Sequence, residues 1–257
     1  MSVIKTFGKY RNLLGELVKK DIKLKYRNSY LGVIWTMLEP LLTMLVLTLV
    51  FSELLGKGTK DFPVYILTGR LLFSFYSNGT KAALKAVRNN AGMIKKVYVP
   101  KYMYPLASVL SGYVIFLISL VVLAVVAVVR GVYPTLQLFW IVVPLAQILL
   151  LTLGSGMLLS TMAVFFRDIE YLWGVALMLL MYTCAIFYKI DSVITGTNGW
   201  IFKYNPLYAI IVNFRNAVFG QAPDFQSMFY ATAFGAVLML FGTFVFYKQQ
   251  DKFILYL

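Results

Sequence analysis

The chain of 257 residues contains no histidine and a single cysteine, Cys184. Without histidine, the commonest metal ligand and the usual general base are both missing, and one cysteine excludes an internal disulfide. Acidic residues are also scarce, with ten Asp and Glu against 24 Lys and Arg. These shortages argue against a metalloenzyme or an acid–base enzyme, so we expect no metal site and no covalent chemistry.

The chain is rich in apolar residues and poor in charged ones. Hydrophobic residues make up 60% of the chain and charged residues 13%, whereas soluble domains are nearer half apolar and a quarter charged. The formal net charge is +14, but the cations form clusters that alternate with apolar runs. Such clusters set membrane topology and contact anionic headgroups, so nucleic acid is not an expected partner. The composition predicts an all-α integral membrane protein.

Six stretches have the length and apolar character of membrane spans, given that about 20 residues cross a bilayer as a helix. They lie at about 31–51, 62–80, 102–129, 135–166, 169–188 and 225–247. The second is the weakest because it contains Arg70. The sequence therefore predicts one six-span transmembrane domain over residues 31–257.

Residues 1–30 are too polar for a signal peptide. Leu14, Leu17, Val18 and Ile22 follow helical spacing, with lysines on the other side. This pattern predicts an amphipathic segment lying in the cytoplasmic membrane interface, and a solvated basic tail is the alternative.

The distribution of cations predicts the orientation. With both termini cytoplasmic, the inner side holds 17 lysines and arginines, the outer side six, and Arg70 lies within a span. Because cytoplasmic loops carry the excess of positive charge, we expect both termini and the loop 88–101 inside, and the segment 189–224 outside. Membrane lipids are thus expected neighbours on both sides.

The loop between the second and third spans is basic and contains no acid. On a helix, Ile94, Val97 and Tyr98 share one face, while Lys95 and Lys96 point elsewhere. A short amphipathic helix of this kind suits docking into a groove on a cytoplasmic partner. A positively charged inner loop with no partner is the other interpretation.

The sequence contains no recognisable ATP-binding motif. A phosphate-binding loop needs GxxxxGK[ST], and the nearest fragment, LLGKGTKDF at 54–62, lacks the first glycine and falls on the predicted outer side. We interpret it as a turn, so any ATPase must be a separate chain.

Four motifs carry a resemblance to a known family. They are YRNSYLGVIWTMLEPLL at 26–42, NAGMIKKVYVPKYMYPLASVLS at 90–111, FFRDIEYLW at 165–173 and NPLYAIIVNFR at 205–215. In this order and spacing the chain resembles the membrane (permease) subunits of ABC-type polysaccharide exporters. These export lipid-linked O-antigen, teichoic acid or capsular glycans from the cytoplasm across the plasma membrane of a bacterium or archaeon.

The resemblance implies partners and functional residues. It implies a homodimer bound to two ATP-binding subunits, which would hold ATP and Mg²⁺. The basic loop is similar to a coupling helix that fits a cleft in the ATPase, formed here by Met93, Ile94, Lys95, Lys96, Val97 and Tyr98. Residues 189–224 are similar to an external gate, with Trp200, Tyr204, Phe214 and Phe219 as its candidates, although a segment that merely packs is the alternative.

Aromatic residues near the span entrances are candidates for a substrate path, because flat apolar rings can contact sugars. They are Tyr30, Trp35, Phe73, Phe75 and Tyr76. The resemblance suggests an aromatic path at a dimer interface. Anchoring at the lipid interface is the alternative explanation for each ring.

Charged residues at the spans suggest two further sites. Glu39 and Arg70 each lie about 12 Å deep, at levels that differ by about 6 Å, so we expect them to pair within one chain or across a dimer. Snorkelling of Arg70 to the outer headgroups is the alternative.

A cluster at the inner end of the fifth span has two interpretations. Asp168 is the expected helix cap and Glu170 favours the helix N-terminus. The resemblance adds a cytoplasmic gate that contacts a lipid headgroup, with Tyr26, Arg27, Arg167 and Asp168 as candidates.

Other functions fit the sequence less well. A drug or small-lipid exporter of the same architecture would match the four motifs less closely. A membrane glycosyltransferase or acyltransferase would need clustered acids, histidine or a metal site, and a passive channel would need a selectivity filter.

Overall fold

The computed structural model describes residues 3–27, 29–55, 61–96, 99–188 and 199–256. These parts of the chain are helical and contain no strand. The helices are α1 (Val3–Lys25), α2 (Trp35–Leu55), α3 (Phe62–Asn89), α4 (Ala91–Ile94), α5 (Met103–Arg130), α6 (Val142–Phe165), α7 (Ile169–Thr183), α8 (Gly199–Lys203), α9 (Pro206–Val218), α10 (Phe225–Gln249) and α11 (Phe253–Tyr256). Short 3₁₀ turns lie at η1 (Gly32–Ile34), η2 (Leu136–Ile141) and η3 (Gln250–Lys252).

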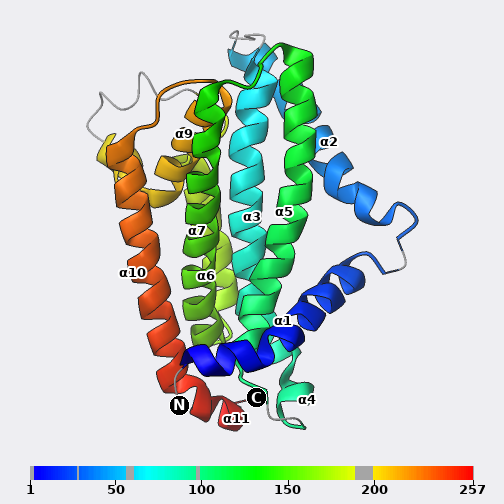
Figure 1. Ribbon diagram of the computed structural model, residues 1–257, viewed down its shortest axis with the longest axis vertical. Coiled ribbons are helices and arrows are strands. Elements are labelled where there is room, and N and C mark those ends of the chain that lie inside the picture. Colours follow the sequence, from blue (N-terminus) through cyan, green and yellow to red (C-terminus); the bar gives the residue numbers. More distant parts are fainter. Residues whose placement is uncertain (1–2, 28, 56–60, 97–98, 189–198, 257) are drawn as a thin grey trace.

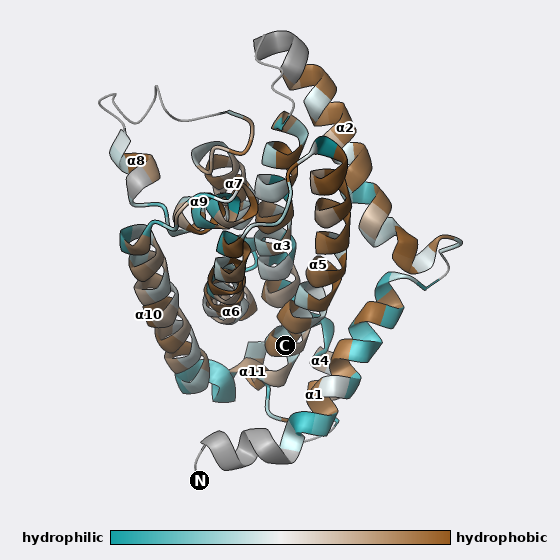
Figure 2. Cartoon of the chain, turned by 45° about the horizontal axis from the view of Figure 1, so that its top comes forward, coloured by the Kyte–Doolittle hydropathy of each residue, from teal (hydrophilic) through white to brown (hydrophobic). Residues whose placement is uncertain are grey.

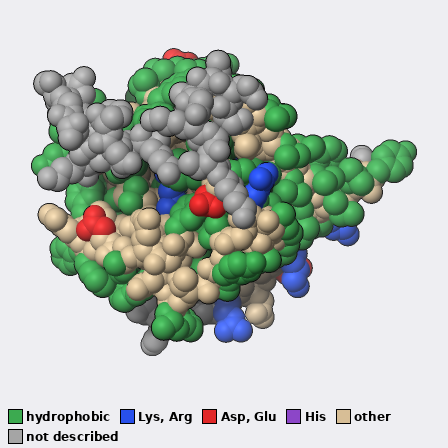
Figure 3. Space-filling model, turned by 90° about the horizontal axis from the view of Figure 1, so that it is seen from above, with side chains coloured by type: hydrophobic (Ala, Val, Ile, Leu, Met, Phe, Trp, Pro, Cys, Tyr) green, Lys and Arg blue, Asp and Glu red, His purple; other side chains and the backbone are tan. Residues whose placement is uncertain are grey.

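The long helices form one bundle, with α3 in its middle (Figure 1). Both termini and α4 lie at the lower end, and α1 runs across that end at a steep angle to the bundle. Seen from above, the opposite end shows a few separate acidic and basic side chains (Figure 3). The two termini and the basic loop therefore share one end, as the distribution of cations requires.

Four described segments are long and apolar enough to cross a membrane: Gly32–Phe51, Met103–Arg130, Leu136–Phe165 and Phe225–Tyr256. They correspond to four of the six predicted spans. The other two differ from expectation. Helix α3 is long, at 28 residues, but more polar, and α7 has 15 residues, which at about 1.5 Å per residue rise only about 22 Å.

Helix α3 is more polar than its neighbours and is enclosed by them (Figure 2). It packs against α2, α5, α6, α7 and α9. Its polar groups find partners in these helices: the Tyr76 hydroxyl lies 3.1 Å from Ser155 Oγ, and Thr80 Oγ1 accepts a hydrogen bond of 2.9 Å from Trp173 Nε1. Burial in protein satisfies groups that hydrocarbon would leave unpaired.

Small residues bring α6 and α10 into backbone contact. A Cβ added to Gly154 would lie 2.6 Å from the Met239 nitrogen, and one added to Gly242 would lie 2.5 Å from the Gly154 carbonyl oxygen. Close approach through small residues is the usual way in which apolar helices associate where lipid supplies no hydrophobic driving force.

A buried arginine explains the early end of α7. Arg215 on α9 is 5% exposed, and its guanidinium lies 3.6 Å from the centroid of the Tyr65 ring. Its Nη1 donates to the Ala185 carbonyl at 3.1 Å, and its Nη2 donates to the Tyr65 carbonyl at 3.2 Å. Ala185 has a φ of 47°, so the chain turns there instead of continuing the helix. The sequence placed Arg215 among the outer cations, and the structure shows that its side chain is buried in the bundle and is not an exposed loop charge.

The contact between α6 and α10 predicts a stability difference between two glycine substitutions. Gly242→Ala places a methyl group against a carbonyl oxygen of the facing helix, and overpacking of this kind costs about 1–3 kcal/mol. Gly112→Ala is the matched control, because its Cβ would lie 3.9 Å from Phe75. Thermal unfolding in one detergent should show a lower Tm for Gly242→Ala alone. Equal Tm values for the two variants would contradict the close contact.

Candidate functional site

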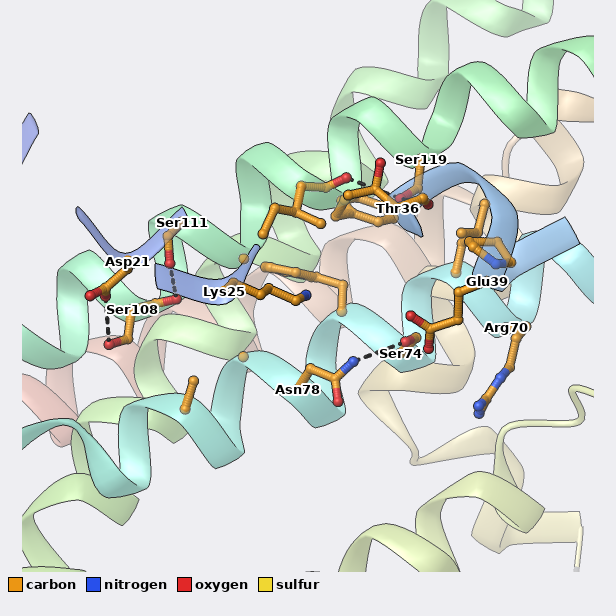
Figure 4. A pocket seen from close by; sticks show the side chains of 18 of the residues that line it. Asp21, Lys25, Thr36, Glu39, Arg70, Ser74, Asn78, Ser108, Ser111 and Ser119 are labelled. Atoms are coloured by element: carbon orange, nitrogen blue, oxygen red, sulfur yellow. Dashed lines mark hydrogen bonds between the residues drawn. The ribbon is translucent and has the colours of Figure 1, made fainter. Parts of the chain in front are cut away.

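A cavity of about 470 Å³ lies between α1, α2, α3 and α5. Its wall is unusually polar for a bundle of apolar helices. The polar side chains that line it and are labelled in Figure 4 are Asp21, Lys25, Thr36, Glu39, Arg70, Ser74, Asn78, Ser108, Ser111 and Ser119. Four helices therefore contribute to one hydrophilic hollow.

The polar side chains reach the cavity because each helix carries them at helical spacing. Helix α2 contributes Thr36, Glu39 and Thr43, α3 contributes Arg70, Ser74 and Asn78, and α5 contributes Ser108, Ser111 and Ser119. Residues three, four, seven or eight apart lie on one helix face. Sequence reasoning missed most of these residues, although the same spacing would have revealed a polar stripe on each helix.

Hydrogen bonds across the cavity join its walls. Ser108 donates to Asp21 Oδ2 at 3.3 Å, which ties α5 to α1, and Ser119 donates to the Thr36 carbonyl at 3.0 Å, which ties α5 to α2. Burial raises the pKa of the Asp21 carboxyl, while the hydrogen bond from Ser108 and the charge of Lys20 oppose the rise. Asp21 therefore gains a proton at a higher pH than an exposed aspartate.

Glu39 and Arg70 both line the cavity, as their predicted depths suggested. They do not form an ion pair within the chain: the ion pairs among the described residues join Lys19 with Glu16 and Glu170 with Lys85 and Arg88. In Figure 4 the two side chains extend in different directions. Pairing between two copies of the chain stays a prediction.

The aromatic candidates separate into three groups. Phe75 lines the cavity, and Trp35 lines a second hollow of about 470 Å³ that shares Lys25, Tyr26, Glu39 and Thr43 with the first. Phe73 and Tyr76 are buried in the core, whereas Tyr30 is fully exposed and lines neither hollow. Of the five candidates, only Phe75 and Trp35 line a hollow, and their two hollows share part of their walls.

The basic loop is arranged differently from the prediction. Its helix, α4, ends at Ile94, and Val97 and Tyr98 lie outside the described residues. Ile94 is 8% exposed and belongs to an apolar cluster, whereas Met93 is 39% exposed. We call the apolar cluster that contains Ile94 the lower cluster. Its buried residues are Leu14, Leu17, Ala86, Val87, Ile94, Met103, Tyr104, Ala107, Met157, Val164, Phe246 and Phe253. The outward apolar residue of α4 is thus Met93, while Ile94 anchors the loop to the bundle.

The cluster before α7 joins two helices. Asp168 occupies the residue before the helix, as predicted, but its side chain makes no capping hydrogen bond. Glu170 in the first turn of α7 forms ion pairs with Lys85 and, at 2.8 Å, with Arg88 on α3. Asp168 and the neighbouring Arg167 are exposed at this end.

The remaining gate candidates lie in distinct environments. Tyr26 lines both hollows, and Arg27 is exposed. On the far side, Trp200 and Tyr204 are each 62% exposed. Phe214 is fully buried and Phe219 is half-buried against the core, so both support α9 from within.

A bundle of long apolar helices around a polar hollow has the architecture of a membrane transport protein. Groups of three or more potential metal-ligating side chains are absent from the described residues. Residues 12–219 match the family described as the ABC-2 type transporter. The chain therefore belongs to the ABC-2 type transporter family.

Similar proteins align over nearly the whole chain. An "O-antigen export system permease protein RfbA" from Klebsiella pneumoniae is 29% identical, covering 94% of this chain and 93% of its own length. A protein of the same description from Myxococcus xanthus is 25% identical, covering 98% and 97%. The "Polysialic acid transport protein KpsM" of Escherichia coli is 21% identical, covering 93% of each chain.

The polar wall predicts that the cavity contains water, and the single cysteine makes this testable. In a Cys184→Ser background, Ser74→Cys places a thiol on the cavity wall, whereas Ser160→Cys places one at a fully buried position of α6. A charged methanethiosulfonate reagent should modify the first thiol and spare the second, because the reagent reacts only where water reaches. A gel-shift assay of the remaining free thiol measures both. Equal protection of the two positions would mean that the hollow is dry or closed.

Proposed function

We propose that this chain is the membrane subunit of an ATP-driven exporter that moves a lipid-linked polysaccharide, of the O-antigen, teichoic acid or capsular type, from the cytoplasmic side across the plasma membrane of a bacterium or archaeon. The observation that carries the proposal is the alignment, end to end, with permeases described as exporting O-antigen. Export of drugs or small lipids is less favoured, because a further relative is described as a polysialic acid transport protein.

The proposed topology has six spans with both termini in the cytoplasm. The excess of cations at the end that carries the termini and α4 supports this orientation. Helix α3, with 28 residues, is about 42 Å long and so exceeds a hydrocarbon core of about 30 Å. Its polar face is tolerated because neighbouring helices cover it, and α7 with the turn held by Arg215 completes the remaining crossing.

The proposed assembly contains two copies of this chain and two ATP-binding subunits. The chain has no GxxxxGK[ST] motif, so ATP and Mg²⁺ belong to the partner. Helices α2 and α7 each expose an apolar face, including Leu45 and Leu49 on α2 and Val175 and Met178 on α7. A second copy packed on these faces would form the dimer path that the resemblance implies.

Each part of the site takes a separate role in this proposal. Trp35 and Phe75 present rings to sugars, and hydroxyl groups of the cavity wall replace hydrogen bonds that sugars lose on leaving water. Tyr26, Arg27, Arg167 and Asp168 stand at the cytoplasmic entrance, where arginine suits a phosphate-linked lipid headgroup.

The remaining roles lie at the two ends of the path. Trp200 and Tyr204 belong to the external gate, and α4 to the contact with the ATPase. The chain itself carries out no covalent step.

Depletion of the chain in its native cell tests the proposal directly. We expect the surface polysaccharide to disappear while its lipid-linked form accumulates on the cytoplasmic side, since synthesis continues without export. Glycan staining of intact cells and mass spectrometry of extracted lipids report the two pools. An unchanged surface glycan, at full depletion, would rule out this function.

The two residues of α4 should respond differently to the same substitution. Met93→Asp alters an exposed position, so the chain should fold normally but retain little ATPase through affinity purification in mild detergent. Ile94→Asp buries a carboxylate in the lower cluster, which costs several kcal/mol, so the yield of folded chain should fall. Size-exclusion chromatography separates the two effects. Normal ATPase recovery with Met93→Asp would contradict the docking role of α4.

A further inference from the structure

The last described residues form an exposed apolar turn. Ile254, Leu255 and Tyr256 are 55%, 81% and 57% exposed, one after another, in α11. Single exposed apolar residues are common, but three in succession form a contiguous patch.

Contacts of Phe253 and Gln250 with the bundle hold this turn in place. Phe253 has 0% exposure and lies in the lower cluster, with its ring centroid 5.2 Å from that of Phe246 and 5.9 Å from that of Phe165. Lys101 Nζ donates a hydrogen bond of 2.6 Å to the Gln250 carbonyl. Residues 250–253 are therefore held against the bundle, and the exposed residues of α11 follow directly after this anchor.

The turn lies at the same end of the bundle as α4. Phe253 and Ile94 belong to the same apolar cluster, and Figures 1 and 2 both show α11 and α4 at the lower end of the bundle. The side chain of Met93 on α4 is exposed at the same end. The two elements have the same construction, with one buried anchor residue and an adjacent exposed apolar residue.

The position of the patch favours a protein partner over lipid. Both α4 and α11 lie below α1, farther from the bundle than the helix that we place in the membrane interface (Figure 1). Exposed cations adjoin these residues along the chain: Lys95 and Lys96 follow Met93, and Lys248 and Lys252 precede Ile254, with the exposed acid Asp251 beside Lys252. A matching partner would offer an apolar depression with an acidic rim.

We propose that Ile254, Leu255 and Tyr256 form a second docking contact for the ATP-binding subunit, at the same end of the bundle as Met93. This inference rests on the proposed function, because it assigns a second contact to the same partner. The partner would then contact both α4 in the basic loop and α11, which follows α10. Movement of the partner would then displace α10 and α5 together, since Gln250 and Lys101 join them.

A pair of leucines provides a matched test. Leu255, in α11, and Leu136, in η2 after the C-terminal end of α5, are 81% and 83% exposed. Helix α11 and the C-terminal end of α5 lie at opposite ends of the bundle (Figure 1). Leu255→Asp should weaken binding of the ATP-binding subunit by roughly tenfold, the effect of losing one well-packed apolar contact. Leu136→Asp should leave binding unchanged. Binding is measured by titrating the purified partner onto the full chain in lipid nanodiscs.

Crosslinking identifies what covers the patch. In the Cys184→Ser background, a photoactivatable maleimide on Leu255→Cys should crosslink to the ATP-binding subunit in native membranes. Crosslinks to lipid or to a second copy of this chain would overturn the inference, as would equal partner affinity for Leu255→Asp and the unmodified chain. If the unmodified chain itself binds no ATP-binding subunit, the proposed function fails and the inference falls with it.

Discussion

Hydrocarbon offers no hydrogen-bonding partners, and this constraint governs the arrangement around α3. Arg70, Ser74 and Asn78 give this helix a polar face that cannot be turned toward lipid. Helices α2 and α5 therefore gather around it and turn their own polar stripes inward. The enclosed faces do not fill the space between them, and the polar cavity is the result (Figure 4). The packing of the bundle and its candidate functional site thus have a single physical cause.

The lower cluster joins α4 and α11 to the rest of the bundle. It contains the anchor residues of α4 and α11, Ile94 and Phe253, together with buried side chains from α1, α3, α5, α6 and α10. Packed interiors have low compressibility, so a displacement imposed at one surface is passed to its neighbours. A partner that moves α4 would therefore act on most of the bundle at once.

The sequence predicted the helical class, the four most apolar spans and the shared end of the termini, because hydropathy and charge clustering are local signals. It placed Ile94 on the outward face of α4, which is wrong, because the direction of a one-turn helix depends on the bundle beneath it. The end of α7 also escaped prediction, since it depends on Arg215, some 30 residues away along the chain. The cavity escaped prediction because its wall combines polar residues from four helices, and their meeting in space depends on the tertiary packing.

The cavity and the lower cluster are connected by the same helices. On α5, Ala107 packs in the lower cluster while the next residue, Ser108, lines the cavity; on α3, Ala86 lies in the cluster one turn beyond Ala82 of the cavity wall. Helix α1 contributes Leu17 to the cluster and, one turn later, Asp21, which Ser108 holds by a hydrogen bond. Neighbouring turns of three rigid helices thus belong to both places. A shift of the lower cluster would therefore reach the cavity wall through the same helices.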